Sequence, residues 1–162
     1  MKTIVNVDNN WGIGLGDSLI NHIPADMKFF KEKTTGNVVV MGKSTFLTFP
    51  GKKALPNRVN IVLTTDPEWS APDVIVCHSI EELFVQLKRY DPSTVYVIGG
   101  SSVYEQLLPY CDTAYVTKVD NEKPADKFFP DLDKNEDWKM VCESETMEHN
   151  GVSYKFTTYR TI

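Results

Sequence analysis

The stretch Ile23-Pro24-Ala25-Asp26-Met27-Lys28-Phe29-Phe30 decides how the rest of this sequence is interpreted. Pro24 suits the first turn of a helix, where its missing N–H costs nothing, and Met27 and Phe30 recur at helical spacing. Asp26 is therefore expected in that first turn, on one helix face with a thioether and an aromatic ring. Such a face can hold a flat ligand. Alternatively, Asp26 only favours the positive helix N-terminus, for roughly 0.3–1 kcal/mol, and the stretch alone leaves both interpretations open.

The composition is typical of a soluble globular protein. The 162 residues, 41% hydrophobic and 24% charged, are enough for one domain with a core, so we expect a single domain over residues 1–162. The net charge is -5 and no run of Lys and Arg occurs, which argues against a nucleic-acid partner. No apolar run is long enough to span a bilayer. Three scattered cysteines favour the cytoplasm, and three scattered histidines predict no metal site.

Short runs rich in Val and Ile alternate with helical patterns along the chain. We predict strands over residues 2–7, 37–41, 59–63, 74–77, 94–98 and 113–119, with helices beginning at residues 24, 43, 79 and 103. This alternation indicates an α/β fold, with a mostly parallel central sheet and flanking helices. A strand over 138–143 and a turn at Asn150-Gly151 predict an antiparallel C-terminal hairpin at its edge. Residues 9–21 show no element, and we predict a mobile loop that covers Asp26.

Three predicted strand ends carry groups suited to phosphate. Gly42-Lys43-Ser44-Thr45 and Gly99-Gly100-Ser101-Ser102 each place glycine before a helix, whose exposed N–H groups favour anions, and Thr64-Thr65 adds two hydroxyls. The carboxyl ends of parallel strands meet at one edge of a sheet, so the three could converge on one ligand. Asn37 and Asp17 stand where a P-loop and a G-x-G-x-x-G fingerprint would need glycine. The pattern by itself therefore predicts only a nucleotide-binding α/β domain.

In order along essentially the whole chain, the motifs resemble those of dihydrofolate reductases. They are Trp11-Gly12-Ile13-Gly14, Ile23-Pro24-Ala25-Asp26-Met27 with Phe30, Val40-Met41-Gly42-Lys43, Leu55-Pro56-Asn57-Arg58, Val97-Ile98-Gly99-Gly100 with Val103-Tyr104, and Phe129-Pro130. The resemblance implies hydride transfer from NADPH to C6 of dihydrofolate, with a proton reaching N5, to give tetrahydrofolate. Two alternatives are a related pyrimidine- or riboflavin-pathway reductase and a noncatalytic nucleotide-binding domain. Asp26 together with Arg58 favours dihydrofolate reductase over the related reductase, because a ribosyl-phosphate substrate does not need a carboxylate-binding group at Arg58. The presence of the acid argues against a noncatalytic domain.

The resemblance also implies roles for individual residues. Asp26 is the expected catalytic residue: it would accept hydrogen bonds from the pteridine N3 and 2-amino group and promote protonation of N5, with a pKa raised by its apolar neighbours. Arg58 would bind the glutamate α-carboxylate of the substrate. The other expected substrate-binding residues are Ile4, Val5, Met27, Phe30, Phe49, Leu55, Ile98, Tyr104 and Thr117. NADPH is expected to contact Asn6, Ile13, Gly14, Leu15, Gly42, Lys43, Ser44, Thr45, Leu63, Thr64, Thr65, His78, Gly99, Gly100, Ser101, Ser102 and Val103. The Gly99-Gly100 peptide bond is expected to be cis, and the protein is expected to be a monomer.

Three positions depart from the family pattern. Ile20-Asn21 stands where the family commonly has Pro-Trp, so the tryptophan that helps to hold a water beside the acid is missing, and Asn21 is the residue expected to rebuild that water site. Asn6 replaces a small alanine. Lys43 replaces a frequent arginine, and a point charge in place of a planar fork predicts a weaker preference for NADPH.

Overall fold

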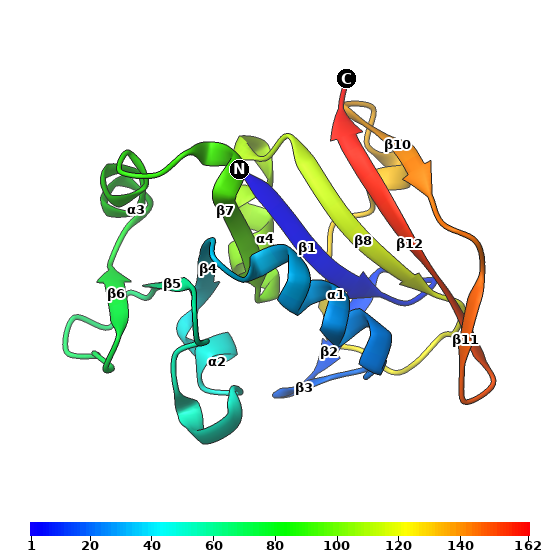
Figure 1. Cartoon of the computed structure of the whole chain (residues 1–162), viewed down its shortest axis with the longest axis horizontal. Coiled ribbons are helices and arrows are strands. Elements are labelled where there is room, and N and C mark those ends of the chain that lie inside the picture. Colours follow the sequence, from blue (N-terminus) through cyan, green and yellow to red (C-terminus); the bar gives the residue numbers. More distant parts are fainter.

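One nine-stranded sheet organises the chain, and the computed structural model describes all 162 residues (Figure 1). The strand order is β10-β12-β8-β1-β7-β4-β5-β6, and β11 pairs with β12. Strands β8, β1, β7, β4, β5 and β6 run parallel, whereas β12 is antiparallel to its neighbours. The predicted parallel sheet with an antiparallel C-terminal edge is confirmed. The strands are β1 (Lys2–Val7), β4 (Val38–Gly42), β5 (Val59–Leu63), β6 (Val74–Cys77), β7 (Val95–Gly99), β8 (Thr113–Val119), β10 (Trp138–Glu143), β11 (Met147–His149) and β12 (Val152–Thr161).

Four helices connect and cover these strands: α1 (Pro24–Thr34), α2 (Lys43–Phe46), α3 (Ile80–Leu87) and α4 (Ser101–Leu107). Helix α1 begins at the predicted proline. Helix α2 is a single turn, and the chain becomes extended at Phe49, the residue before Pro50. Helix α4 begins two residues before the predicted start. Short 3₁₀ turns lie at η1 (Pro50–Lys52), η2 (Pro92–Thr94), η3 (Leu108–Tyr110) and η4 (Leu132–Lys134).

An apolar core lies on each face of the sheet. The larger core contains Val5 together with Leu83 of α3 and Leu107 of α4. The smaller core contains Ile4 and packs against Phe29 and Phe30 of α1, and Figure 1 shows α1 in front of β1. Because side chains alternate along a strand, Ile4 and Asn6 share the α1 face and Val5 faces the other core. Burying one such large apolar side chain stabilises the fold by about 1.5–3 kcal/mol.

Residues 9–21 form a small second sheet, so the prediction of an irregular loop was wrong. Strands β2 (Gly12–Leu15) and β3 (Ser18–Leu19) pair with each other, and β2 pairs with β9 (Lys127–Phe128). The Asp8 carboxylate accepts hydrogen bonds from the Gly12 N–H at 2.8 Å and the Lys123 N–H at 3.1 Å, which ties the two segments together. Gly16 lies 110 residues from its partner Asp126. Pairing at that separation leaves no signal in the local sequence.

Candidate active site

Asp26 is held by side chains from two neighbouring strands. Asn6 of β1 and Thr117 of β8 are direct partners in the parallel register, so both side chains point to the α1 face. The Asn6 Nδ2 group donates to Asp26 Oδ2 at 2.9 Å, and the Thr117 hydroxyl donates to Asp26 Oδ1 at 2.5 Å. A carboxylate offers about four lone-pair positions, so each oxygen keeps one for a further donor.

The surroundings of Asp26 oppose its charge. Burial raises its pKa above the usual value because the carboxylate loses water, while the hydrogen bonds from Thr117 and Asn6 lower the pKa in part. The predicted direction is confirmed. On the other side of β1, the buried Tyr104 hydroxyl donates to the Ile4 carbonyl at 2.7 Å, and burial strongly raises the pKa of Tyr104. The phenol is therefore neutral at physiological pH.

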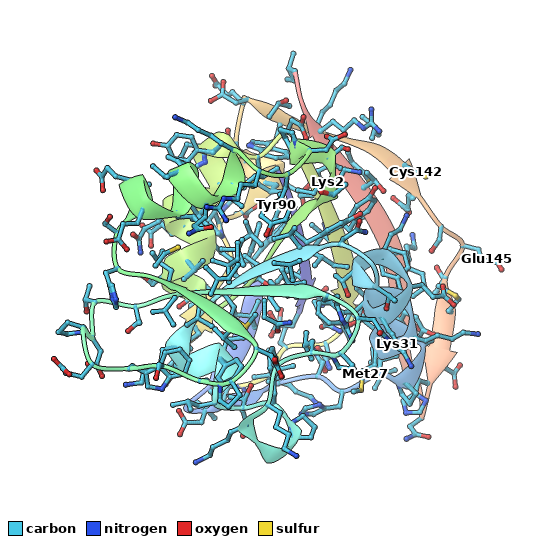
Figure 2. All side chains as sticks on the ribbon, turned by 60° about the vertical axis from the view of Figure 1, so that its left-hand side comes forward. Lys2, Met27, Lys31, Tyr90, Cys142 and Glu145 are labelled. Carbon is cyan, nitrogen blue, oxygen red and sulfur yellow. The ribbon has the colours of Figure 1, made fainter.

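Apolar side chains gather on the same face of the sheet as Asp26. Ile4 and Ile98 belong to the smaller core, and the residues packed against this core include Phe30, Phe49 and Leu55. Met27 is 64% exposed on α1, where Figure 2 shows it near Lys31. Val5 lies with the opposite core, so only its backbone is available on the α1 side. Five of the residues expected to bind the substrate rings, Ile4, Phe30, Phe49, Leu55 and Ile98, therefore lie with the core on the α1 side, whereas the Val5 side chain does not.

Arg58 is oriented by groups that the sequence did not reveal. Its Nε donates to the Pro56 carbonyl at 2.9 Å and its Nη1 donates to Thr34 Oγ1 at 3.0 Å. Of the five N–H groups of a guanidinium, three remain available for an anion. Partial burial lowers the pKa of Arg58, but a guanidinium stays protonated in proteins. The fork therefore remains open and is held in one orientation.

Buried Asn60 fixes the loop that carries Arg58. Its Oδ1 accepts from the Leu55 N–H at 2.9 Å, and its Nδ2 donates to the carbonyls of Leu55 and Arg58 at 2.9 and 3.1 Å. The amide of Asn60 thus bonds both backbone groups of Leu55. A polar residue inside the Val59–Leu63 strand was the available signal, because buried amides need partners.

The two glycine junctions lie against each other at neighbouring strand ends. A Cβ on Gly100 would lie 3.2 Å from Thr45 Oγ1, and one on Gly42 would lie 3.2 Å from Val103 Cγ2, so a side chain at either position would require its neighbour to shift by a few tenths of an ångström. No side chain caps α2 or α4, which leaves the N–H groups of their first turns available. The Gly99-Gly100 bond is cis, as predicted. The arrangement exposes backbone to a close ligand.

A carboxylate that the local sequence did not indicate lies beside Lys43. The Lys43 Nζ is 3.1 Å from Asp66 Oδ2, and the Asp66 N–H donates to Thr64 Oγ1 at 3.2 Å. Hydrogen bonds from the Glu68 N–H and from Lys43 lower the pKa of Asp66. His78 Nδ1 lies 3.1 Å from the Thr64 carbonyl oxygen. The turn after β5 brings Asp66 next to Lys43, which lies 23 residues away in the sequence, so this pairing could not be predicted from local pattern.

The other predicted cofactor residues are distributed over the same strand ends and the second sheet. Ser44 and Thr65 are exposed, Leu63 is half-buried at the end of β5, and Ser101 and Ser102 open α4. Ile13 and Gly14 are buried in β2, and Leu15 at its end is exposed. No three His, Cys, Asp or Glu side chains come together where they could hold a metal ion. No helix is long and apolar enough to cross a membrane.

Asn21 makes no hydrogen bond to Asp26. Its side-chain amide is paired reciprocally with that of Asn121, at 3.3 Å and 2.8 Å. The adjacent His22 is exposed. The asparagine that contacts Asp26 is Asn6. Asn21, at the position where the resemblance implies tryptophan, is hydrogen-bonded to Asn121 instead.

Comparisons with known proteins agree over the whole chain. A sequence model of the family described as dihydrofolate reductase matches residues 1–161. The dihydrofolate reductase of Bacillus subtilis (strain 168) is 34% identical over 158 residues, which cover 96% of this chain and 91% of that protein. The enzyme of Staphylococcus aureus (strain Mu50 / ATCC 700699) is 36% identical over 146 residues, covering 89% and 87%. A solved structure, dihydrofolate reductase from Enterococcus faecalis complexed with NADP(H) and RAB-propyl, superposes with a TM-score of 0.87 at 37% identity and covers 99% of this chain and 95% of that one.

Proposed function

Because this chain belongs to the dihydrofolate reductase family and catalyses the reduction of dihydrofolate, we propose that Asp26 binds and activates the pteridine ring. The observation that carries the proposal is the state of its carboxylate: each oxygen accepts one hydrogen bond from the protein and keeps one lone pair. The pteridine N3–H and 2-amino group are two adjacent donors that match this acceptor. A negative charge at that end of the ring favours positive charge on the ring system, and therefore protonation at N5.

The rest of the substrate fits the groups on the same face. The apolar side chains of Phe30, Phe49, Leu55 and Ile98 suit the pteridine and aminobenzoyl rings. The three remaining N–H groups of Arg58 suit the glutamate α-carboxylate, which a planar fork binds at two points. Thr34 and Asn60 support this end of the site by holding Arg58 and its loop.

The residues present also fit NADPH. The close approach of Gly42 and Gly100 to their neighbours and the uncapped first turns of α2 and α4 suit a pyrophosphate bound by backbone N–H groups. Lys43, with the hydroxyl groups of neighbouring Ser44 and Thr65, would hold the ribose 2′-phosphate. When bound, NADPH supplies the hydride that dihydrofolate accepts at C6. The relative from Enterococcus faecalis was complexed with NADP(H), which supports the same assignment here.

We also infer that one chain suffices and that it works in the cytoplasm. Every group assigned above comes from this chain, in support of the expected monomer with a small-molecule substrate. Its three cysteines are free and two of them, Cys77 and Cys111, are buried, which agrees with a reducing compartment. Nucleic acid and membrane are not among the partners we assign, since the chain is acidic overall.

The test follows NADPH absorbance with and without dihydrofolate. Asp26→Asn is expected to lower kcat/KM at neutral pH by about 10²–10⁴-fold, with partial recovery at acid pH, where solvent protonates N5. Exposed Asp137→Asn is the matched control and should behave as the unchanged protein. Equal turnover by Asp26→Asn and the control would remove Asp26 from the mechanism, and absence of substrate-dependent decay would contradict the activity itself.

A further inference from the structure

We propose that Asn6 is a positioning residue that holds Asp26 in its ionised form and fixes the plane of its carboxylate. The proposal rests on the function proposed for Asp26 and adds a donor at position 6, where the resemblance implies a small alanine. Its basis is the bond from Asn6 Nδ2 to Asp26 Oδ2 at 2.9 Å. An alanine has no donor there.

The geometry is that of a two-armed clamp formed by Asn6 and Thr117. The two residues are in register across the parallel β1–β8 pair, and each donates to a different oxygen of Asp26. With both arms in place the carboxylate cannot turn about its Cβ–Cγ bond without breaking a hydrogen bond. The two remaining lone pairs therefore keep fixed directions. The same two donors stabilise the carboxylate more strongly than the neutral acid, because hydrogen bonds to an ionised acceptor are stronger, and this favours ionisation.

No cation shares this task. The charged and titratable groups on the elements around Asp26 bond elsewhere, lie over aromatic rings or are exposed. Tyr104 donates to the Ile4 carbonyl, Lys118 pairs with Asp133, and Asp8 accepts from the Gly12 and Lys123 N–H groups. Lys2 and Lys33 both lie over the Tyr115 ring, and the exposed residues are His22, Lys28, Lys31 and Glu32. Among side chains, Asn6 and Thr117 are thus the two that oppose the effect of burial on Asp26. Losing one of two donors should shift the ionisation of Asp26 measurably.

The experiment measures the pKa of Asp26 directly in the free protein, from the ¹³C signal of its carboxyl carbon as a function of pH, assigned with Asp26→Asn. Asn6→Leu removes the donor at similar volume and should raise the pKa of Asp26 by about one unit, the effect of one hydrogen bond to a charged group. Asn6→Asp is isosteric and should raise the apparent pKa further, since two carboxylates at this distance share a proton. If Asn6→Leu fails to fold, the pKa of Asp26 in Asn6→Asp tests the proposal instead.

Asn21→Ser is the matched control, because the amide of Asn21 pairs with Asn121 and not with Asp26. It should leave the pKa of Asp26 unchanged. In turnover assays, the pH profile of kcat/KM of Asn6→Leu should move to higher pH, by the same amount as the pKa of Asp26 rises in the titration. A pKa of Asp26 that is equal in Asn6→Leu and the unchanged protein, or that moves equally in Asn21→Ser, would overturn the proposal. Because the titration uses neither substrate nor cofactor, its outcome is separate from that of the Asp26→Asn assay.

Discussion

Keeping Asp26 ionised in the folded protein lowers the free energy of unfolding at neutral pH. Its pKa in the folded chain is raised above the unfolded value of 3.8, so the folded state holds its proton to a higher pH than the unfolded state does. Stability from this group is therefore fully present below pH 3.8 and is lost as pH rises through the folded pKa. We predict that Asp26→Asn is more stable than the unchanged protein at pH 7, and that the gain shrinks towards pH 4. Urea unfolding at both pH values measures this, with Asp137→Asn as control; a gain independent of pH would contradict the stated cause.

Lys43 and Asp66 together should set how strongly the ribose 2′-phosphate is preferred. The Asp66 carboxylate, 3.1 Å from the Lys43 Nζ, neutralises the cation that would meet the phosphate. We predict that Asp66→Asn raises the preference for NADPH over NADH by about fivefold, the size expected for one exposed ion pair, and that Lys43→Ala lowers it. Dissociation constants of both cofactors from fluorescence quenching give the ratio. Parallel changes for both cofactors would show that Lys43 does not read the 2′-phosphate.

At the level of elements, local patterns sufficed wherever an element is specified by its own residues. The Val-rich strands, the Pro24 start of α1 and the Asn150-Gly151 turn were predictable because each depends on adjacent positions. Strands β2 and β3 were missed, since their pairing depends on β9, far along the chain. The contacts made by Asn6 and Thr34 were missed for the same reason. The family resemblance could assign residues to a site but not the direction of each side chain, as Val5 illustrates.

The loop from Leu55 to Arg58 depends on one buried side chain from the next strand. Asn60→Ala would leave the Leu55 N–H and carbonyl without their partner, which should cost about 1–3 kcal/mol of unfolding free energy. Because the loop carries Arg58, KM for dihydrofolate should rise while kcat changes little. Asn60→Asp keeps the acceptor for the Leu55 N–H but turns a buried carboxylate oxygen toward the carbonyls of Leu55 and Arg58, so its effect on KM should be at least as large as that of Asn60→Ala. An unchanged KM in both variants would separate the loop from substrate binding.

In the whole molecule, the site is assembled from segments that meet only in the folded sheet. The acid comes from α1, its donors from β1 and β8, the glycines from the ends of β4 and β7, and Arg58 from the loop before β5. Four of these strands are adjacent and parallel, so the site-forming ends of β4 and β7 gather at one edge of the sheet. Because these segments separate when the sheet unfolds, the unfolded chain has no assembled binding site. Ligand binding should therefore act on global stability.

Stabilisation by each ligand can test the cofactor-binding and substrate-binding parts of the site separately. NADPH at 100 times its dissociation constant should stabilise the protein by about 2.7 kcal/mol, or roughly 5–10 °C in Tm for a chain of this length. Gly100→Ala should lose most of this shift, because the new Cβ would lie 3.2 Å from Thr45 Oγ1 and cover the backbone, although φ of −87° tolerates alanine. The same variant should keep the shift produced by dihydrofolate, whereas Asp26→Asn should lose that shift and keep the one from NADPH. The measurement is the Tm of each variant with NADPH, with dihydrofolate and without ligand. A full NADPH shift in Gly100→Ala would mean that the glycine junction does not bind the cofactor.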